Sequence, residues 1–110
     1  MPGKFELKKS NGGRFMFNLK AGNGQIILTS EPYASKQAAQ NGIDSVKKNA
    51  ATDGRYERKV SRKGEPFFVL KGGNGQVIGC SEVYSGGAAM ENGIACVKKN
   101  AVQASVLDQT

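Results

Sequence analysis

Two stretches of the chain read NGIDSVKKNA (residues 41–50) and NGIACVKKNA (residues 92–101), and they lie 51 positions apart. The same offset relates most of the sequence. Residues 4–51 align with residues 55–102 without a gap, and 24 of the 48 pairs are identical. Half identity at one fixed offset is far above chance, so the chain is an internal duplication. We expect two repeats, residues 3–53 and 54–102, followed by a disordered tail at residues 103–110.

Each repeat carries the patterns of three strands and one helix. In the first repeat, apolar and polar residues alternate over residues 4–9 and 14–20. An Ile- and Leu-rich strand at residues 25–30 follows a Gly22-Asn23-Gly24 hairpin turn, and residues 36–48 show apolar positions at helical spacing. The corresponding expectations in the second repeat are strands at residues 55–61, 66–71 and 76–81 and a helix at residues 87–99.

One repeat alone would leave a sheet edge unpaired and would bury too small a core to be stable. Joining the two sheets edge to edge, with both helices on one face, removes both problems. We therefore predict an α+β fold, a two-layer sandwich in which two tandem β-β-β-α repeats share one mostly antiparallel sheet of about six strands. The 110 residues are expected to form a single domain. Its expected core includes Phe17, Leu19, Ile43, Val46, Phe68, Leu70, Ile94 and Val97.

Gly42 and Gly93 occupy equivalent positions in the middle of the two expected helices, where glycine costs about 1 kcal/mol relative to alanine. The same cost at the same place in both repeats indicates that another part of the chain approaches closely there. We expect each helix to press on the sheet or on the other helix at this point, near a pseudo-two-fold axis. A ligand that reaches the helix at Gly42 is the alternative.

A Ser-Glu-x-Tyr motif follows the third strand of each repeat, at Ser30, Glu31 and Tyr33 and at Ser81, Glu82 and Tyr84. We interpret it as a strand-to-helix corner, in which the tyrosine packs its ring under the helix while serine and glutamate bond to the loop or the helix N-terminus. Glu31 and Glu82, paired by pseudo-symmetry, would instead form a two-carboxylate acid/base site, which is the less favoured interpretation. The sequence contains no His, and we expect no catalytic residue, cofactor or metal.

The net charge is +7, and each repeat contributes +4, with Asp108 in the tail subtracting one. A basic bias of this size attracts nucleic acid or an acidic protein, or simply keeps a small protein soluble. No apolar run approaches the roughly 20 residues of a membrane-spanning helix, and the N-terminal residues lack the apolar segment of a secretory signal. We therefore expect a cytoplasmic protein without membrane contact. Cys80 and Cys96 correspond to Thr29 and Ser45 in the first repeat, which indicates free thiols.

The sheet face opposite the helices combines charged residues with one aromatic ring. By strand alternation it carries Glu6, which is expected to be solvent-exposed, together with the candidate binding residues Lys8, Lys20, Lys59, Phe67 and Lys71. Amines that meet phosphates and a ring that stacks on bases would suit weak binding of single-stranded nucleic acid. The favoured interpretation is a solvated face, or a homodimer contact through Phe67 and Val69 in a protein otherwise expected to be a monomer.

The duplicated unit, with its Gly-Asn-Gly hairpin, Ser-Glu-x-Tyr corner and Asn-Gly-Ile-x-x-Val-Lys-Lys-Asn helix, resembles the YegP-like family of small bacterial proteins of unknown function. The resemblance covers residues 3–102 and implies a fold of two β-β-β-α units that share a single sheet. It implies no established activity, substrate or catalytic residue. We therefore expect a non-enzymatic binding or interaction module, with weak single-stranded nucleic-acid binding as the more specific alternative.

Overall fold

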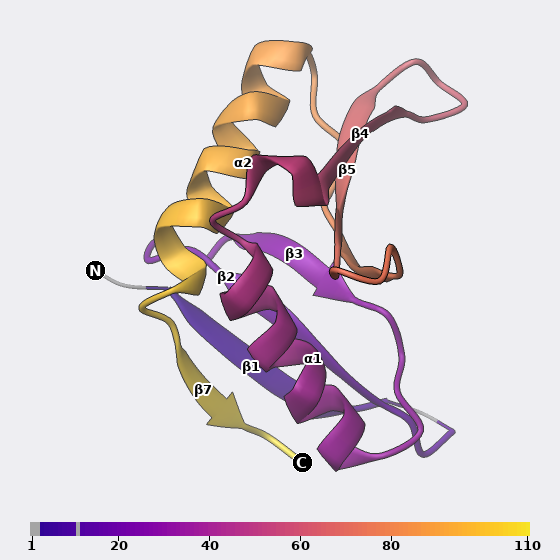
Figure 1. Ribbon diagram of the computed structural model, residues 1–110, viewed down its shortest axis with the longest axis vertical. Coiled ribbons are helices and arrows are strands. Elements are labelled where there is room, and N and C mark those ends of the chain that lie inside the picture. Colours follow the sequence, from indigo (N-terminus) through magenta and orange to yellow (C-terminus); the bar gives the residue numbers. More distant parts are fainter. Residues whose placement is uncertain (1–2, 11) are drawn as a thin grey trace.

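Each repeat forms three strands and then a helix, as the computed structural model, which describes residues 3–10 and 12–110, shows. Both helices lie in front of the same face of one sheet (Figure 1). The first repeat consists of β1 (Lys4–Lys9), β2 (Phe15–Lys20), β3 (Ile26–Ser30) and α1 (Lys36–Asn49). The rest of the chain consists of the 3-10 turn η1 (Asp53–Arg55), β4 (Tyr56–Val60), β5 (Pro66–Lys71), β6 (Val77–Cys80), α2 (Gly87–Ala101) and β7 (Ser105–Asp108).

The strands form a single sheet in the order β4-β5-β6-β3-β2-β1-β7. The two repeats meet through β3 and β6, which pair antiparallel with Thr29 opposite Cys80. The neighbouring strands within each repeat are antiparallel as well, whereas β7 runs parallel to β1. The predicted α+β sandwich with both helices on one face is therefore confirmed, and a seventh strand is added to the six that the sequence indicates.

The expectation of a disordered tail at residues 103–110 is wrong for Ser105–Asp108, which form β7. Without this segment the outer backbone groups of β1 would have no strand partner, and β7 supplies one in parallel register. All four residues of β7 are exposed, so the strand forms through backbone pairing and not through burial of its side chains. Hydrophobic periodicity reports burial, which is why no pattern in the sequence indicated this strand.

One hydrophobic cluster, with side chains from both repeats, fills the space between the sheet and the helices. Each helix contacts strands of its own repeat and of the other one, so neither repeat buries its core alone. In the described part of the chain, no helix is long and apolar enough to cross a membrane. The expected core residues are all buried, with no more than 2% of their surface exposed. They are Phe17, Leu19, Ile43, Val46, Phe68, Leu70, Ile94 and Val97.

Gly42 and Gly93 lie against the tyrosine rings of the two Ser-Glu-x-Tyr motifs. A Cβ atom at Gly42 would lie 2.8 Å from Cζ of Tyr33, and one at Gly93 would lie 2.6 Å from Cζ of Tyr84. The Tyr33 ring also stacks on Phe17, with ring centroids 6.3 Å apart, and Cε2 of Phe17 would lie 3.0 Å from the same Cβ atom at Gly42. The expected close approach at the two glycines is therefore present. Its nearest partner is the tyrosine of the same repeat and not the other helix, and the expected contact with the sheet is present at Gly42 through the ring of Phe17 on β2.

We expect Gly42→Ala to lower the free energy of unfolding by about 1–2 kcal/mol. Alanine favours the helix by about 1 kcal/mol, but the added methyl group would lie 2.8 Å from Cζ of Tyr33, and so close an overlap costs about 2–3 kcal/mol, the upper part of the range for overpacking. Gly93→Ala should behave in the same way against Tyr84. Urea denaturation of the single variants measures both effects.

Gly87→Ala is the matched control, because a Cβ at this helical glycine meets open space. That change should leave stability unchanged or raise it slightly. In the double variant Gly42→Ala/Tyr33→Phe, loss of the hydroxyl should restore part of the lost stability, which a double-mutant cycle reports as coupling. A Gly42→Ala protein as stable as the parent would show that the ring does not lie where the structure places it.

Candidate functional site

The serine of each Ser-Glu-x-Tyr motif ties the end of the third strand to the second strand. Ser30 Oγ accepts a hydrogen bond from the N–H of Phe17 at 2.9 Å and donates one to the carbonyl oxygen of Glu31 at 2.8 Å. Ser81 makes the same two bonds in the second repeat. The serines therefore bond to a strand and to the adjacent loop carbonyl, whereas the side-chain hydrogen bonds expected of Glu31 and Glu82 are absent from the described part of the chain. The helix N-terminus of α1 is capped by Ser35 instead.

The tyrosine of the motif is fixed by backbone pairing as well as by its ring. Tyr33 and Phe15 exchange two backbone hydrogen bonds, of 2.8 and 2.7 Å, across an isolated bridge. In the second repeat Pro66 takes the place of Phe15 and has no N–H, so the N–H of Tyr84 donates one bond to the Pro66 carbonyl at 2.8 Å. Burial, and next the charge of Glu31, raise the pKa of Tyr33. The Tyr33 hydroxyl is therefore a neutral hydrogen-bonding group at physiological pH.

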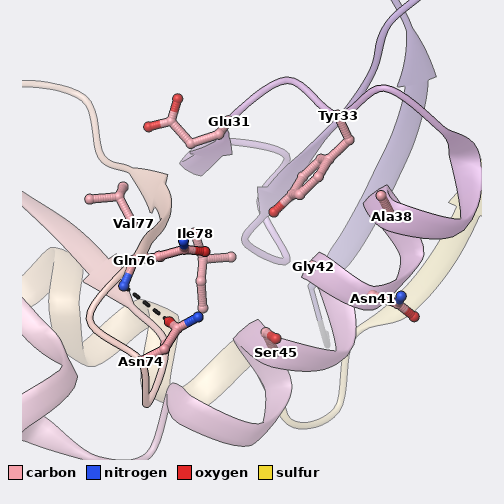
Figure 2. Close-up of a pocket in the computed structure, with 11 residues that line it drawn as sticks. Glu31, Tyr33, Ala38, Asn41, Gly42, Ser45, Asn74, Gln76, Val77 and Ile78 are labelled. Atoms are coloured by element: carbon pink, nitrogen blue, oxygen red, sulfur yellow. Dashed lines mark hydrogen bonds between the residues drawn. The ribbon is translucent and has the colours of Figure 1, made fainter.

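A cavity of about 370 Å³ opens beside Tyr33, between the two repeats. Figure 2 shows the Tyr33 hydroxyl pointing into this inter-repeat cavity and Glu31 at its rim, with the Glu31 carboxylate directed outward. The first repeat lines it with the corner and α1, through Glu31, Tyr33, Ala38, Asn41, Gly42 and Ser45. The second repeat lines it with the end of the β5–β6 hairpin, through Gly72, Asn74, Gln76, Val77 and Ile78.

The inter-repeat cavity has a neutral polar lining with one charge. Asn74 Oδ1 accepts a hydrogen bond from the N–H of Gln76 at 3.1 Å, which fixes the Asn74 side chain at the cavity wall. Among the described residues, Glu31 is the only lining residue with a formal charge, and its carboxylate forms no ion pair with them. Sequence reasoning singled out Glu31 and Tyr33 but missed Ser45, Asn74 and Gln76. The repeated Gly-Asn-Gly-Gln motif was the available signal, and a tight hairpin already accounted for it.

A second cavity, of about 430 Å³, lies at the related position of the other repeat. Three of its lining residues, Ala21, Asn23 and Cys96, are the counterparts, 51 positions away, of residues that line the first cavity. It also contains Lys99, whereas neither Glu82 nor Tyr84 lines it. The duplication therefore produces two related cavities with different charges.

The sheet register keeps Glu31 and Glu82 apart. Thr29 pairs with Cys80, so the two glutamates are displaced from that pair in opposite directions, by two residues each. At about 3.3 Å per residue, their Cα atoms lie about 13 Å apart along the strands. Only Glu31 lines the inter-repeat cavity. The structure thus does not assemble the two-carboxylate site that the sequence left open as an alternative.

The two cysteines are free thiols, in line with the sequence. Burial raises the pKa of Cys80, and the charges of Glu31 and Glu82 raise it further. The Cys80 thiol is therefore protonated at neutral pH and a poor nucleophile. Residues 3–10 and 12–110 contain no group of three or more His, Cys, Asp or Glu side chains that could hold a metal ion.

The expectation that Glu6 is exposed to solvent is wrong, because only 5% of the residue's surface is accessible. In register it lies between Asn18 on β2 and Leu107 on β7. Its carboxylate lies 3.0 Å from Nζ of Lys20 and 3.5 Å from Nζ of Lys8. The hydrogen bond from Lys20 is the main cause of a lowered pKa of Glu6, which burial partly opposes.

All four lysines of the candidate binding face are paired with a glutamate. Lys8 and Lys20 contact Glu6, and their counterparts Lys59 and Lys71 contact Glu57. Phe67 is only partly exposed, and Val69 is 5% exposed. The face therefore offers fewer free positive charges and less exposed apolar surface than the sequence indicates.

The fold and the repeated corner define a class of small duplicated β-β-β-α proteins, and comparison with known proteins identifies the family. The family model described as a domain of unknown function, DUF1508, matches residues 10–57 and again residues 61–108. The two matches start 51 residues apart, which is the offset of the internal repeat. The chain belongs to this family, which confirms the resemblance noted in its sequence.

Its relatives are bacterial UPF0339 proteins. The chain is 53% identical to YegP of Yersinia pestis, over 98% of this chain and 96% of that protein. It is 56% identical to a UPF0339 protein of Bordetella pertussis, over 100% of this chain and 98% of that protein. Two solution NMR structures match the fold. Escherichia coli YegP has a TM-score of 0.95 at 48% identity, covering 100% of this chain and 95% of that one. The Shewanella oneidensis UPF0339 protein has a TM-score of 0.92 at 46% identity, covering 98% and 92%.

We expect Glu6→Gln to lower the free energy of unfolding at pH 7 by about 1.5–3 kcal/mol, the usual range for hydrogen bonds to charged groups. Because the pKa of Glu6 is lowered in the folded state, its contribution is present above its ordinary value of 4.5. That contribution is lost as the pH falls through the lower, folded-state pKa. The difference in stability between parent and variant should therefore shrink in acid, which urea denaturation at several pH values measures.

Glu57→Gln is the matched control at the equivalent position. The Glu57 side chain is 44% exposed, against 6% for Glu6, so its ion pairs are more strongly screened by solvent. The Glu57 variant should lose less stability than the Glu6 variant. Equal losses for the two variants would contradict the burial difference that β7 creates.

Proposed function

We propose that this protein is a non-enzymatic binding module whose ligand occupies the inter-repeat cavity. The observation that carries the proposal is that both cavity walls come from motifs present in each repeat, the Ser-Glu-x-Tyr corner on one side and the Gly-Asn-Gly-Gln hairpin on the other. The cavity volume lies within the range of about 300–1,000 Å³ that is usual for small-molecule sites. The separation of Glu31 and Glu82 supports binding without catalysis. The free thiols of Cys80 and Cys96 support a cytoplasmic location.

The walls of the cavity are held by internal hydrogen bonds. In the hairpin, the N–H of Gly72 donates to the carbonyl of Gln76 at 2.9 Å, and the N–H of Gly75 donates to the carbonyl of Gly72 at 3.0 Å. On the opposite wall, Tyr33 is clamped between its backbone bridge and Gly42. A preformed site of this kind loses little conformational entropy when a ligand binds, which supports its use as a binding site.

We expect Gln76→Trp to block ligand binding, because the indole would occupy the cavity from the hairpin side. Small polar fragments that bind the parent protein should shift the backbone amide signals of Gly42, Ser45 and residues 72–78 in ¹H–¹⁵N NMR spectra. The same fragments should leave those signals unchanged in the variant. The expected loss of affinity is at least tenfold.

Gln25→Trp provides the control, because Gln25 is the equivalent residue of the first hairpin and lines neither described cavity. Fragment binding should survive this change. The proposal fails if no fragment shifts the cavity amides of the parent protein, or if both tryptophan variants reduce binding equally.

The second candidate function is weak binding of single-stranded nucleic acid on the sheet face opposite the helices. Each repeat places an apolar residue directly opposite a lysine on the neighbouring strand, and this arrangement favours the second candidate function. Met16 lies opposite Lys8, and Phe67 lies opposite Lys59. Both apolar residues are partly exposed. A base could stack on Phe67 while the neighbouring amine meets a phosphate. The pairing of these lysines with Glu6 and Glu57 argues for low affinity.

We expect short oligonucleotides to bind weakly or not at all, because each amine already has a carboxylate partner. Any binding should weaken with salt, with a log–log slope of about −0.7 for each phosphate contact. Glu57→Gln releases Lys59 and Lys71 and should strengthen such binding, while Phe67→Ala should weaken it by about 1–3 kcal/mol. Fluorescence titration measures all three effects. Submicromolar, salt-insensitive binding would contradict this expectation.

A further inference from the structure

We propose that the ligand of the inter-repeat cavity is an organic cation with N–H donors, a primary ammonium or a guanidinium on a short stem, whose charge is held by Glu31. The proposal rests on the function proposed above. It assigns the chemistry of the ligand from the one formal charge that the described lining residues carry. An anionic ligand would meet that charge unfavourably, and a neutral one would leave it unused.

Five of the nine acidic residues of the chain form an ion pair in its described part, and Glu31 is among the four that form none. Glu6, Glu57, Asp53 and Glu91 each contact a lysine or arginine of the chain. In the described part of the chain the Glu31 carboxylate has neither an ion-pair nor a hydrogen-bond partner. A glutamate, Glu82, also stands at the equivalent position of the second repeat. A carboxylate without an internal partner, at the rim of a cavity, is available to an external cation.

The interior of the cavity suits the rest of such a ligand. Ile78 lines it with aliphatic side-chain surface on which a short methylene stem can pack. Tyr33 contributes a neutral hydroxyl that points into the space, and Ser45 lines the helix wall (Figure 2). No lysine or arginine is among the described lining residues, so nothing in the wall repels a positive charge.

The second cavity provides an internal comparison. It is lined by counterparts of the same hairpin and helix positions, but its formal charge is that of Lys99. A cation that recognised only general features of the protein surface would not distinguish the two cavities. A cation that is held by Glu31 should occupy the first cavity and leave the second empty.

Four probes of matched size test the assignment by ¹H–¹⁵N NMR titration: n-butylammonium, n-butylguanidinium, n-butanol and n-butyrate. The two cations should shift the amides of Gly42, Ser45 and residues 72–78 and leave those around Lys99 unchanged. Butanol should bind more weakly, and butyrate should not bind. Glu31→Gln should weaken butylammonium binding about three- to fivefold at low salt, the usual value of an exposed ion pair. Raising the salt concentration should reduce the preference for cations.

Glu82→Gln is the matched control, because Glu82 is the equivalent glutamate and does not line the cavity. It should leave butylammonium binding unchanged. A blocked Gly-Lys-Gly peptide identifies the source of the cation. If the peptide binds more tightly than butylammonium, the natural cation is a side chain of a polypeptide. If the peptide binds more weakly, the natural cation is a free amine. Either result supports the charge assignment.

The outcomes separate this inference from the proposed function. Butanol or butyrate binding in the cavity as tightly as butylammonium would overturn the cation assignment and leave the binding module standing. Equal loss of affinity in Glu31→Gln and Glu82→Gln, or equal shifts at both cavities, would overturn it as well. If neither these probes nor any other small fragment shifts the cavity amides, the proposed function fails together with the inference.

Discussion

The contact between a tyrosine ring and a helical glycine is the constraint on which the rest of the structure depends. Tyr33 can lie against α1 only because Gly42 has no side chain, and Tyr84 depends on Gly93 in the same way. The ring joins the end of β3 to the middle of the helix and stacks on Phe17 in the core. It thereby sets how far the helix stands from the sheet. The same ring forms one wall of the inter-repeat cavity, so stability and the proposed ligand site share one contact.

β1 and β4 are equivalent strands of the two repeats, but only β4 forms an edge of the sheet. β1 carries the buried Leu7 and is covered by β7. At the equivalent position β4 carries Arg58, which pairs with Glu91 at 2.7 Å and with Asp53 at 3.2 Å. Charged side chains on an edge strand discourage pairing with another chain, and a covering strand removes the edge altogether. The cover also accounts for Glu6, which is buried beside β7 while its counterpart Glu57 on the uncovered β4 is partly exposed.

The sequence predicted what depends on burial and local turn chemistry. Alternation and helical spacing located six strands and both helices, because residues such as Phe17 and Ile43 record which side faces the core. It could not predict β7, whose four exposed residues pair through their backbone. It predicted the tyrosine ring under the helix and a close approach at Gly42 but did not connect the two, since a mid-helix glycine indicates only that space is short. Half of the cavity was missed because Asn74 and Gln76 reach it from the other repeat, and a pattern within one repeat carries no information on that contact.

Fusion of the two repeats into one chain has a consequence for the two cavities. In a symmetric dimer of identical units, both cavities would be identical, and every substitution would change both. In the duplicated chain each cavity can change independently, although eight of the eleven residues that line the first cavity have identical counterparts 51 positions away. Gly42 and Tyr33 have identical counterparts, whereas Ser45 corresponds to Cys96 and Gly72 to Ala21. Because one cavity carries a glutamate and the other a lysine, the same architecture presents opposite charges at two related places. A single ligand therefore has reason to choose one cavity, which is why charge, more than shape, is expected to decide where it binds.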